Sequence, residues 1–206
     1  MADGQLDQAR TQDVPATERP ASRRGFLTGL GRLAIGACAA GAAFDPSSVL
    51  AATVGASRRT LSLVSLHTNE KLKVTYWADG RYVPTALADA NELLRDWRSG
   101  EIGKIDPKLL DLLFALRTKL HTDEPFQVIS GYRSPKTNAM LAGRTRHSGV
   151  ADKSLHMQGK AIDIDLAGRQ LNRIRQAATE LKLGGVGYYP KSSFVHVDTG
   201  RVRYWS

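Results

Sequence analysis

The sequence holds a single cysteine, Cys38, among its 206 residues. A disulfide needs two cysteines, so no disulfide within the chain can stabilise the fold. A cysteine nucleophile or a cysteine-ligated metal site in the body of the chain is also excluded, because both require a thiolate and Cys38 lies in the N-terminal segment. Histidine and carboxylate side chains remain as the groups that could hold a metal.

A long uninterrupted apolar run is missing as well. The stretch 25–43 is rich in glycine and alanine and contains Arg32, whereas a permanent membrane span needs about 20 predominantly apolar residues. The twin arginine Arg23–Arg24 precedes this stretch. This order is typical of an export signal for the Tat machinery. We therefore expect residues 1–52 to be a Tat-type signal, with no permanent membrane span and a periplasmic or other extracytoplasmic destination.

The end of this signal has two interpretations. The small residues "SVLAA" favour cleavage near Ala51 or Ala52, which leaves residues 53–206 as the exported domain. The alternative is a lipoprotein with lipid on Cys38, although Gly36 is an unusual neighbour for such a site.

Acidic residues are fewer than basic ones, 20 against 29, for a formal net charge of +9. The first 52 residues carry five arginines and five acids, so the excess lies in the remainder. Its basic residues are scattered and are not interleaved with aromatics in a stripe, which argues against a nucleic-acid partner. An anionic wall polymer or membrane surface is the simpler partner.

Residues 53–206 are expected to form one α+β domain, in which a small antiparallel sheet is flanked by helices. Strands follow from β-rich runs, and helices from apolar residues at helical spacing. We expect a monomer. The predicted elements are a hairpin over 60–67 and 71–77, helices over 84–100, 106–122 and 167–184, strands over 126–130 and 159–166, a short helix before 143, an exposed loop over 143–154, and two or three short strands after 184.

Two short strands carry the candidate chemistry. Alternation in "GKAIDIDL" places Asp163 and Asp165 on one face and the aliphatic residues on the other. In "SFVHVDTG" it does the same for His196 and Asp198. If the two strands are neighbours, Asp163 and His196 converge, and His156 joins them from the preceding loop. Three such ligands leave a fourth position for water, as in catalytic zinc sites.

These residues resemble a known family. "SLHMQGKAID" matches the S-x-H-x-x-G-x-A-x-D motif of the zinc D-Ala-D-Ala peptidases and their LAS relatives, which include lysostaphin and sonic hedgehog. "SGYRSPKTN" resembles their upstream arginine motif, and the C-terminal segment looks closest to the YcbK/MepK-like murein endopeptidases. The resemblance covers residues 60–206. It implies a hedgehog/DD-peptidase-like fold, Zn²⁺ held by His156, Asp163 and His196, and hydrolysis of peptide bonds in peptidoglycan.

The chain departs from the wider group at the position expected for the general base. Many members carry an acid shortly before the last histidine, where this chain has Lys191, Ser192 and Ser193. Asp198 is the first candidate base, because it shares a face with His196 and a base must reach the attacking water. The alternative role for Asp198 is to orient His196. Asp165 is a weaker candidate for the same roles.

Further residues have assigned expectations. Arg133 is expected to bind a substrate carboxylate or the developing oxyanion, with a surface salt bridge as the alternative. Ser154 and Gln158 are candidate substrate contacts. The remaining histidines lie outside any matching motif and are expected to be structural or exposed; they are His67, His121 and His147.

Two classes of function remain open. One is a zinc peptidase acting on the wall, either an endopeptidase on peptide cross-links or a D-Ala-D-Ala carboxypeptidase or dipeptidase. The other is a zinc-containing wall-binding module without turnover. An open fourth position on the metal favours the peptidase.

The twin arginine generates a test of export. Changing both Arg23→Lys and Arg24→Lys is expected to retain the protein in the cytoplasm, because the signal is read through the arginine pair. Cell fractionation with immunodetection measures the distribution. Undiminished periplasmic protein in the double variant would contradict the Tat assignment.

Overall fold

The computed structural model describes residues 55–143, 151 and 153–206. The expected export signal, Cys38, His147 and most of the loop 143–154 lie outside the described residues. Within the described part of the chain, no helix combines the length and apolar character that a membrane crossing requires.

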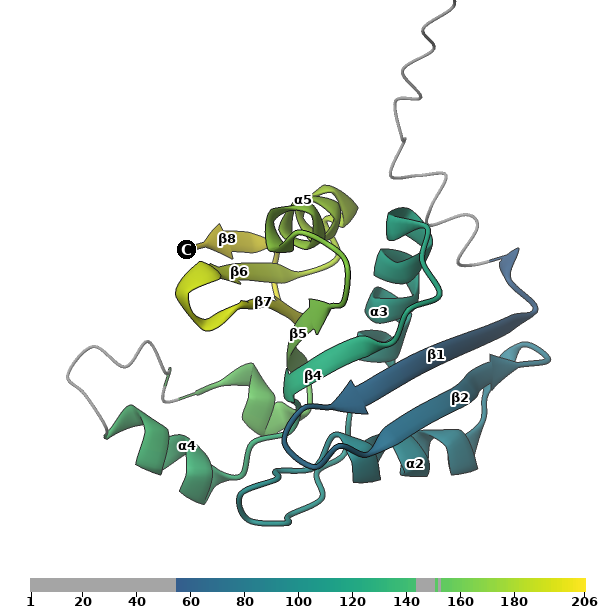
Figure 1. Cartoon of the computed structure of the whole chain (residues 1–206). Coiled ribbons are helices and arrows are strands. Elements are labelled where there is room, and N and C mark those ends of the chain that lie inside the picture. The colour runs from purple at the N-terminus through teal and green to yellow at the C-terminus, as the bar shows by residue number, and fades with distance from the viewer. Residues whose placement is uncertain (1–54, 144–150, 152) are drawn as a thin grey trace, which may run out of the picture. The chain divides into compact units, whose positions relative to one another are not determined.

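The described chain contains both strands and helices, and it begins with three successive strands (Figure 1). The strands are β1 (Arg58–Ser65), β2 (Lys71–Ala78), β3 (Arg81–Tyr82), β4 (Phe126–Ser130), β5 (Ala161–Leu166), β6 (Gly185–Tyr189), β7 (Phe194–Asp198) and β8 (Arg203–Trp205). The helices are α2 (Pro84–Leu93), α3 (Pro107–Leu120), α4 (Pro135–Ala142) and α5 (Leu171–Leu181), with the 3₁₀ turns η1 (Leu155–Gln158) and η2 (Pro190–Ser192).

The eight strands form one sheet in the order β3-β2-β1-β4-β5-β7-β6-β8. Five of the pairings are antiparallel, but β1 pairs with β4, and β6 with β8, in parallel. The expected α+β class is therefore confirmed, and the sheet is larger and more mixed than expected. A parallel pair needs a long crossover, which here includes α2 and α3 between β1 and β4.

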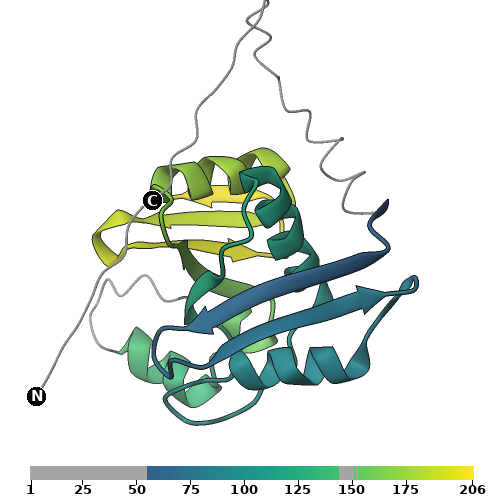
Figure 2. The same ribbon diagram turned by 45° about the vertical axis from the view of Figure 1, so that its right-hand side comes forward.

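Helices cover one face of the sheet. Helix α2 packs on β2, α3 on β1, and α5 on β5, β6 and β7, with α3 beside α5 (Figures 1 and 2). The core lies between these layers and includes Leu113, Ile162, Ile164, Val195 and Val197, all fully buried. Because side chains alternate along a strand, the residues between these aliphatics in β5 and β7 face the opposite side of the sheet.

Helix α3 begins as its sequence predicts. The Asp106 carboxylate accepts a hydrogen bond from the Lys108 N–H, and Pro107 occupies the first turn, where a missing N–H costs nothing. His121 ends the helix in the left-handed conformation with a φ of 48°. His121 is exposed and caps this helix, as expected of a structural or exposed histidine.

Helix α2 ends earlier than its apolar spacing suggested. It stops at Leu93, so Trp97 lies outside it, is 38% exposed, and stacks on His67 with the ring centroids 3.9 Å apart. The expected helix over 84–100 is therefore too long, and Trp97 is not part of a helical apolar face. The reason is Asp96, which is 1% exposed and accepts hydrogen bonds from the Ser134 N–H at 2.9 Å and its hydroxyl at 2.7 Å. This tertiary contact redirects the chain after α2.

Asp96 generates a stability prediction. Burial alone would raise the pKa of this carboxyl, but the hydrogen bonds from Thr137, Ser134 and the Arg98 N–H lower it to about 2. A lowered folded-state pKa stabilises the fold above the ordinary value near 3.9, and this contribution disappears as the pH falls toward about 2. Asp96→Ala is therefore expected to lower the free energy of unfolding by about 2–3 kcal/mol at neutral pH.

Chemical denaturation across the acidic range checks this expectation. The difference between the wild type and Asp96→Ala should shrink as the pH falls from about 4 to about 2. Asp89→Ala is the matched control, because Asp89 is an exposed aspartate on α2. Equal stability of Asp96→Ala and the control would contradict the role given to Asp96.

Candidate active site

Two neighbouring strands and the turn before them bring three ligand-type side chains together. Asp163 in β5 and His196 in β7 are direct cross-strand partners. His156 lies in η1, which leads into β5. All three are at least 92% buried on the face of the sheet opposite the helices. The expected convergence of the three is confirmed.

Gly159 makes the turn between η1 and β5 possible. Its φ is 65°, and a Cβ on this residue would lie 2.0 Å from the Lys104 carbonyl oxygen. Its own carbonyl accepts a hydrogen bond from the Asp106 N–H at 2.9 Å. Only glycine fits a left-handed position with backbone this close. The turn therefore fixes where His156 meets β5.

The pocket-facing atoms of the three side chains lie within ligand distance of one another. His156 Nε2 is 3.4 Å from Asp163 Oδ1 and 3.2 Å from His196 Nδ1, and His196 Nδ1 is 2.9 Å from Asp163 Oδ1. In a tetrahedral site with bonds of about 2.0–2.1 Å, two ligand atoms are about 3.3–3.4 Å apart. The spacing of the three atoms therefore fits a single small cation.

Hydrogen bonds at the outer ring nitrogens of His156 and His196 favour tautomers in which the pocket-facing nitrogens carry lone pairs. His156 Nδ1 lies 2.8 Å from the Gly131 carbonyl oxygen, and His196 Nε2 lies 3.0 Å from Asp198 Oδ2. An oxygen acceptor at one ring nitrogen favours the tautomer with its proton there, which leaves the other nitrogen free to bind a metal. Three acceptors then face one point, which is the donor set of a divalent metal site.

The pKa shifts in the cluster come from contacts among these same buried side chains. Burial alone would raise the pKa of the Asp163 carboxyl, but His156 and His196 beside it hold this pKa well below its usual range. Burial alone would lower the pKa of His196, whereas Asp163 and Asp198 raise it. Asp163 is therefore a carboxylate at neutral pH, ready to bind a cation.

Asp198 is fully buried behind the His196 ring. Its Oδ2 accepts from Arg203 Nη2 at 2.8 Å, and its Oδ1 accepts from Arg203 Nη1 at 3.0 Å and from the Gly200 N–H at 2.8 Å. Burial alone would raise the pKa of Asp198, but His196, Arg203 and Gly200 hold it well below its usual range. Its carboxylate contacts Nε2 of His196, whereas Nδ1 of the same ring faces His156 and Asp163.

Arg133 lies in the loop shortly after β4 and lines the same pocket. Its backbone N–H donates to the His156 carbonyl at 3.2 Å, and its Nη2 lies 3.8 Å from Asp163 Oδ2. Nη1 donates to Asn138 Oδ1 at 3.4 Å, while Nε has no acceptor among the described residues. This side chain is 11% exposed, so its remaining donors are held in the pocket, where they could bind an anionic group.

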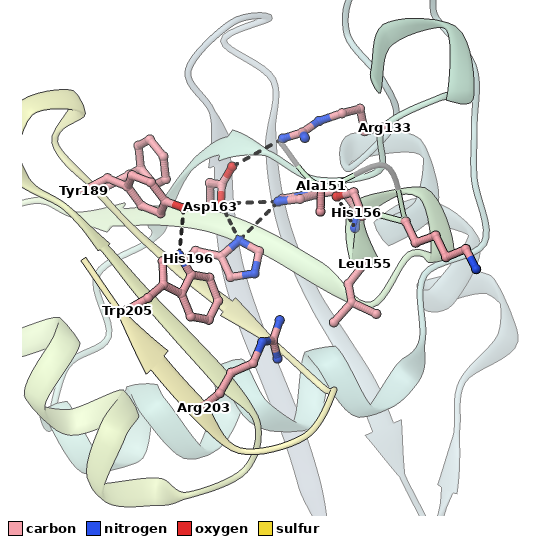
Figure 3. A pocket seen from close by; sticks show the side chains of 12 residues that line it. Arg133, Ala151, Leu155, His156, Asp163, Tyr189, His196, Arg203 and Trp205 are labelled. Carbon is pink, nitrogen blue, oxygen red and sulfur yellow. Dashed lines mark hydrogen bonds and ion pairs between the residues drawn. The ribbon is translucent and has the colours of Figure 1, made fainter. Parts of the chain in front are cut away.

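The pocket has a volume of about 360 Å³ and an aromatic wall. Figure 3 shows Tyr189 and Trp205 on one side of the three ligands, with Arg203 below and Arg133 on the far side. Sequence reasoning missed Tyr189, Trp205 and Arg203. The signal for the last two was the alternation in β8, which places Arg203 and Trp205 on one face. Tyr189 gave no comparable signal, because its place depends on strand pairing.

Of the other expected site residues, Ser154 lines the pocket and Gln158 and Asp165 do not. Ser154 lines the pocket, and its Oγ accepts from the His156 N–H at 3.3 Å, which starts η1. Gln158 is exposed and is not among the residues lining the pocket, because two steps along a 3₁₀ turn point it away from His156. Asp165 shares a strand face with Asp163 but does not line the pocket. His67 is exposed and lies outside the pocket, as expected.

A buried His-Asp-His cluster on a mixed sheet, beside an arginine and an open pocket, defines a metallopeptidase-type centre. The model of an M15 peptidase family, described as "Peptidoglycan L,D-endopeptidase MepK", matches residues 53–205. The chain belongs to this family and is a peptidase.

Curated relatives support the same assignment. The chain is 47% identical over 174 residues to "Peptidoglycan L,D-endopeptidase MepK" of Escherichia coli (strain K12), covering 84% of this chain and 94% of that relative. It is 40% identical over 174 residues to "Probable peptidoglycan L,D-endopeptidase MepK" of Haemophilus influenzae, covering 84% of this chain and 92% of that relative. The expected resemblance to MepK-like peptidases is confirmed.

The cluster generates a metal-binding prediction. The purified protein is expected to hold about one zinc per chain, and His156→Ala and His196→Ala are expected to lose it, because each removes one of three protein ligands. Elemental analysis after gel filtration measures the content. His67→Ala is the matched control, since this exposed histidine lies outside the pocket. Failure of metal-free wild type to take up zinc on titration would refute the site.

Proposed function

We propose that the protein is a zinc-dependent peptidoglycan endopeptidase that hydrolyses peptide cross-links outside the cytoplasm, after Tat export. The observation that carries this proposal is the convergence of His156 Nε2, Asp163 Oδ1 and His196 Nδ1 in an open pocket. The names of the relatives refer to an L,D bond. We extend this to the present chain as a peptide bond whose carbonyl belongs to an L centre and whose nitrogen belongs to a D centre.

His156, Asp163 and His196 would hold the metal, and the pocket side of the cluster would stay open for water and substrate. When bound there, Zn²⁺ would lower the pKa of a water molecule to about 7 and polarise the scissile carbonyl. Asp163 supplies the negative charge that favours a cation at this point. The Gly131 carbonyl keeps His156 in the orientation that this role needs.

Arg133 would hold the carboxylate of a diaminopimelate or D-alanine unit. Its guanidinium is nearly buried and faces the pocket, and its Nε–H has no acceptor among the described residues. A planar fork of this kind binds carboxylates in a fixed direction, so it would determine which peptide bond lies over the metal. Ser154 would limit the same side of the pocket.

We assign Asp198 the role of orienting His196 and not that of the general base. A base must reach the attacking water directly or through one water molecule. The Asp198 carboxylate is fully buried, and its oxygens accept from His196, Arg203 and backbone N–H groups. This is the carboxylate–histidine–metal arrangement that sets the tautomer and basicity of a ligand.

Two alternatives share the same centre. A carboxypeptidase or dipeptidase would need the Arg133 carboxylate contact close to the cleaved bond, and a wall-binding module would hold metal without turnover. The open pocket beside the ligands favours turnover. The masses of the products separate the two peptidase activities, because a carboxypeptidase releases a terminal residue and an endopeptidase separates cross-linked peptides.

Digestion of purified muropeptides tests the proposed function. Zinc-loaded wild type is expected to convert cross-linked muropeptides to monomers, as read by mass spectrometry, while His196→Ala leaves them intact. Wild type with full zinc that cleaves no muropeptide would establish the binding module in its place.

Two further variants test the assigned roles in that assay. Arg133→Lys should keep zinc and lower kcat/KM by about 10- to 100-fold, because the charge stays and the planar fork is lost. Asp198→Asn should weaken zinc affinity by about 10- to 100-fold, as expected of a group that orients a ligand. Full zinc affinity with abolished turnover in Asp198→Asn would instead identify Asp198 as the base.

A further inference from the structure

The hydroxyl of Tyr189 has one defined partner. The Trp205 indole N–H donates to the Tyr189 oxygen at 2.8 Å. An indole nitrogen only donates, so the direction of this bond is fixed and the hydroxyl proton of Tyr189 is left for another acceptor. No described residue accepts it. The Tyr189 hydroxyl can therefore donate a hydrogen bond to a group in the pocket.

Neighbouring residues hold this phenol in place. Tyr189 ends β6 and stacks on Phe194, its cross-strand partner, with the ring centroids 4.6 Å apart. Trp205 lies over Gly187, where a Cβ would come within 2.6 Å of the indole ring. The absent side chain at Gly187 thus gives Trp205 the space in which its N–H meets Tyr189. A stacked ring with a fixed hydrogen bond is a preorganised group.

The phenol stands at the metal cluster. Tyr189 lines the same pocket as His156, Asp163 and His196, and the Trp205 ring that supports it lies 5.2 Å from the His196 ring. Figure 3 shows the Tyr189 hydroxyl turned toward the centre of the pocket, on the side away from the Arg203 guanidinium. A peptide bond placed over the ligands would have this hydroxyl beside it.

We propose that the Tyr189 hydroxyl is a catalytic hydrogen-bond donor to the carbonyl oxygen of the scissile peptide bond. This inference rests on the proposed peptidase function. As the attacking water adds to the carbonyl carbon, negative charge develops on that oxygen, and the hydrogen bond from Tyr189 strengthens while the phenol keeps its proton. Trp205 is then a positioning residue, because its N–H occupies the Tyr189 oxygen and turns the proton into the pocket.

The expected size of the effect follows from other preorganised donors. Removing one donor to a developing oxyanion lowers kcat by about 10²–10³-fold, because the donor acts mainly on the charge of the transition state. The same reason predicts little change in KM, since the ground-state carbonyl carries less charge. A residue that only shaped the pocket would alter KM instead.

The test compares Tyr189→Phe with Tyr188→Phe in the full-length zinc-loaded protein. Tyr188 is the neighbouring strand residue, packs against the core and lies under the Arg175 guanidinium, so it points to the other face of the sheet. Tyr189→Phe should lower kcat on cross-linked muropeptides by about 100-fold or more, with KM within about threefold and zinc content unchanged. Tyr188→Phe should match the wild type.

A second readout does not depend on turnover. An L-alanyl-D-alanine phosphinate pseudodipeptide carries a tetrahedral anion in place of the peptide bond, and calorimetry measures its affinity. Tyr189→Phe should bind this probe at least about 10-fold more weakly than wild type, whereas Tyr188→Phe should not. Trp205→Phe should give an intermediate loss of phosphinate affinity, because the Tyr189 hydroxyl remains but the indole N–H no longer orients it.

The outcomes separate this inference from the proposed function. Wild-type kcat and wild-type phosphinate affinity in Tyr189→Phe would overturn the inference and leave the peptidase intact. Wild type with full zinc that cleaves no muropeptide would overturn the proposed function. In that event the phosphinate affinities still decide whether the Tyr189 hydroxyl reaches the reacting position, and equal affinities for wild type and Tyr189→Phe would refute it.

Discussion

The direct pairing of Asp163 with His196 across β5 and β7 is the constraint on which the rest of the site depends. A shift of β7 by one residue against β5 would turn His196 into the hydrophobic core and bring an aliphatic residue to the pocket beside Asp163. The register is secured from behind, because Ile162, Ile164, Val195 and Val197 are fully buried against the helices. The core therefore specifies the site, and the third ligand needs only a turn to reach it.

Each histidine of the cluster is backed by an oxygen acceptor that the fold provides. Gly131, at the end of β4, accepts from His156, and Asp198 accepts from His196. Arg203 supports Asp198 in turn, with both of its terminal nitrogens on the carboxylate. These groups come from the residue after β4, from β7 itself and from β8, so the electronic character of the candidate ligands depends on several strands of the sheet.

One network joins the arginine side of the pocket to the helical layer. Asp96, just after α2, accepts from Ser134, the residue that follows Arg133 and starts α4. The early end of α2 and the position of the arginine loop thus have one cause. Alternation and helical spacing could not predict it, because a buried carboxylate 38 residues from its partner leaves no local pattern.

Local chemistry in the sequence determined most of the elements, the α+β class and the three candidate metal ligands, since alternation, proline and glycine placement and the His and Asp motifs act over a few residues. Only the tertiary structure decided the mixed sheet, the exposure of Gln158 and the burial of Asp198 behind His196. It also decided the direction of the Tyr189 hydroxyl, which depends on an indole from another strand. Hydrogen-bond direction and strand order are properties of residues distant in the chain, so no local pattern encodes them.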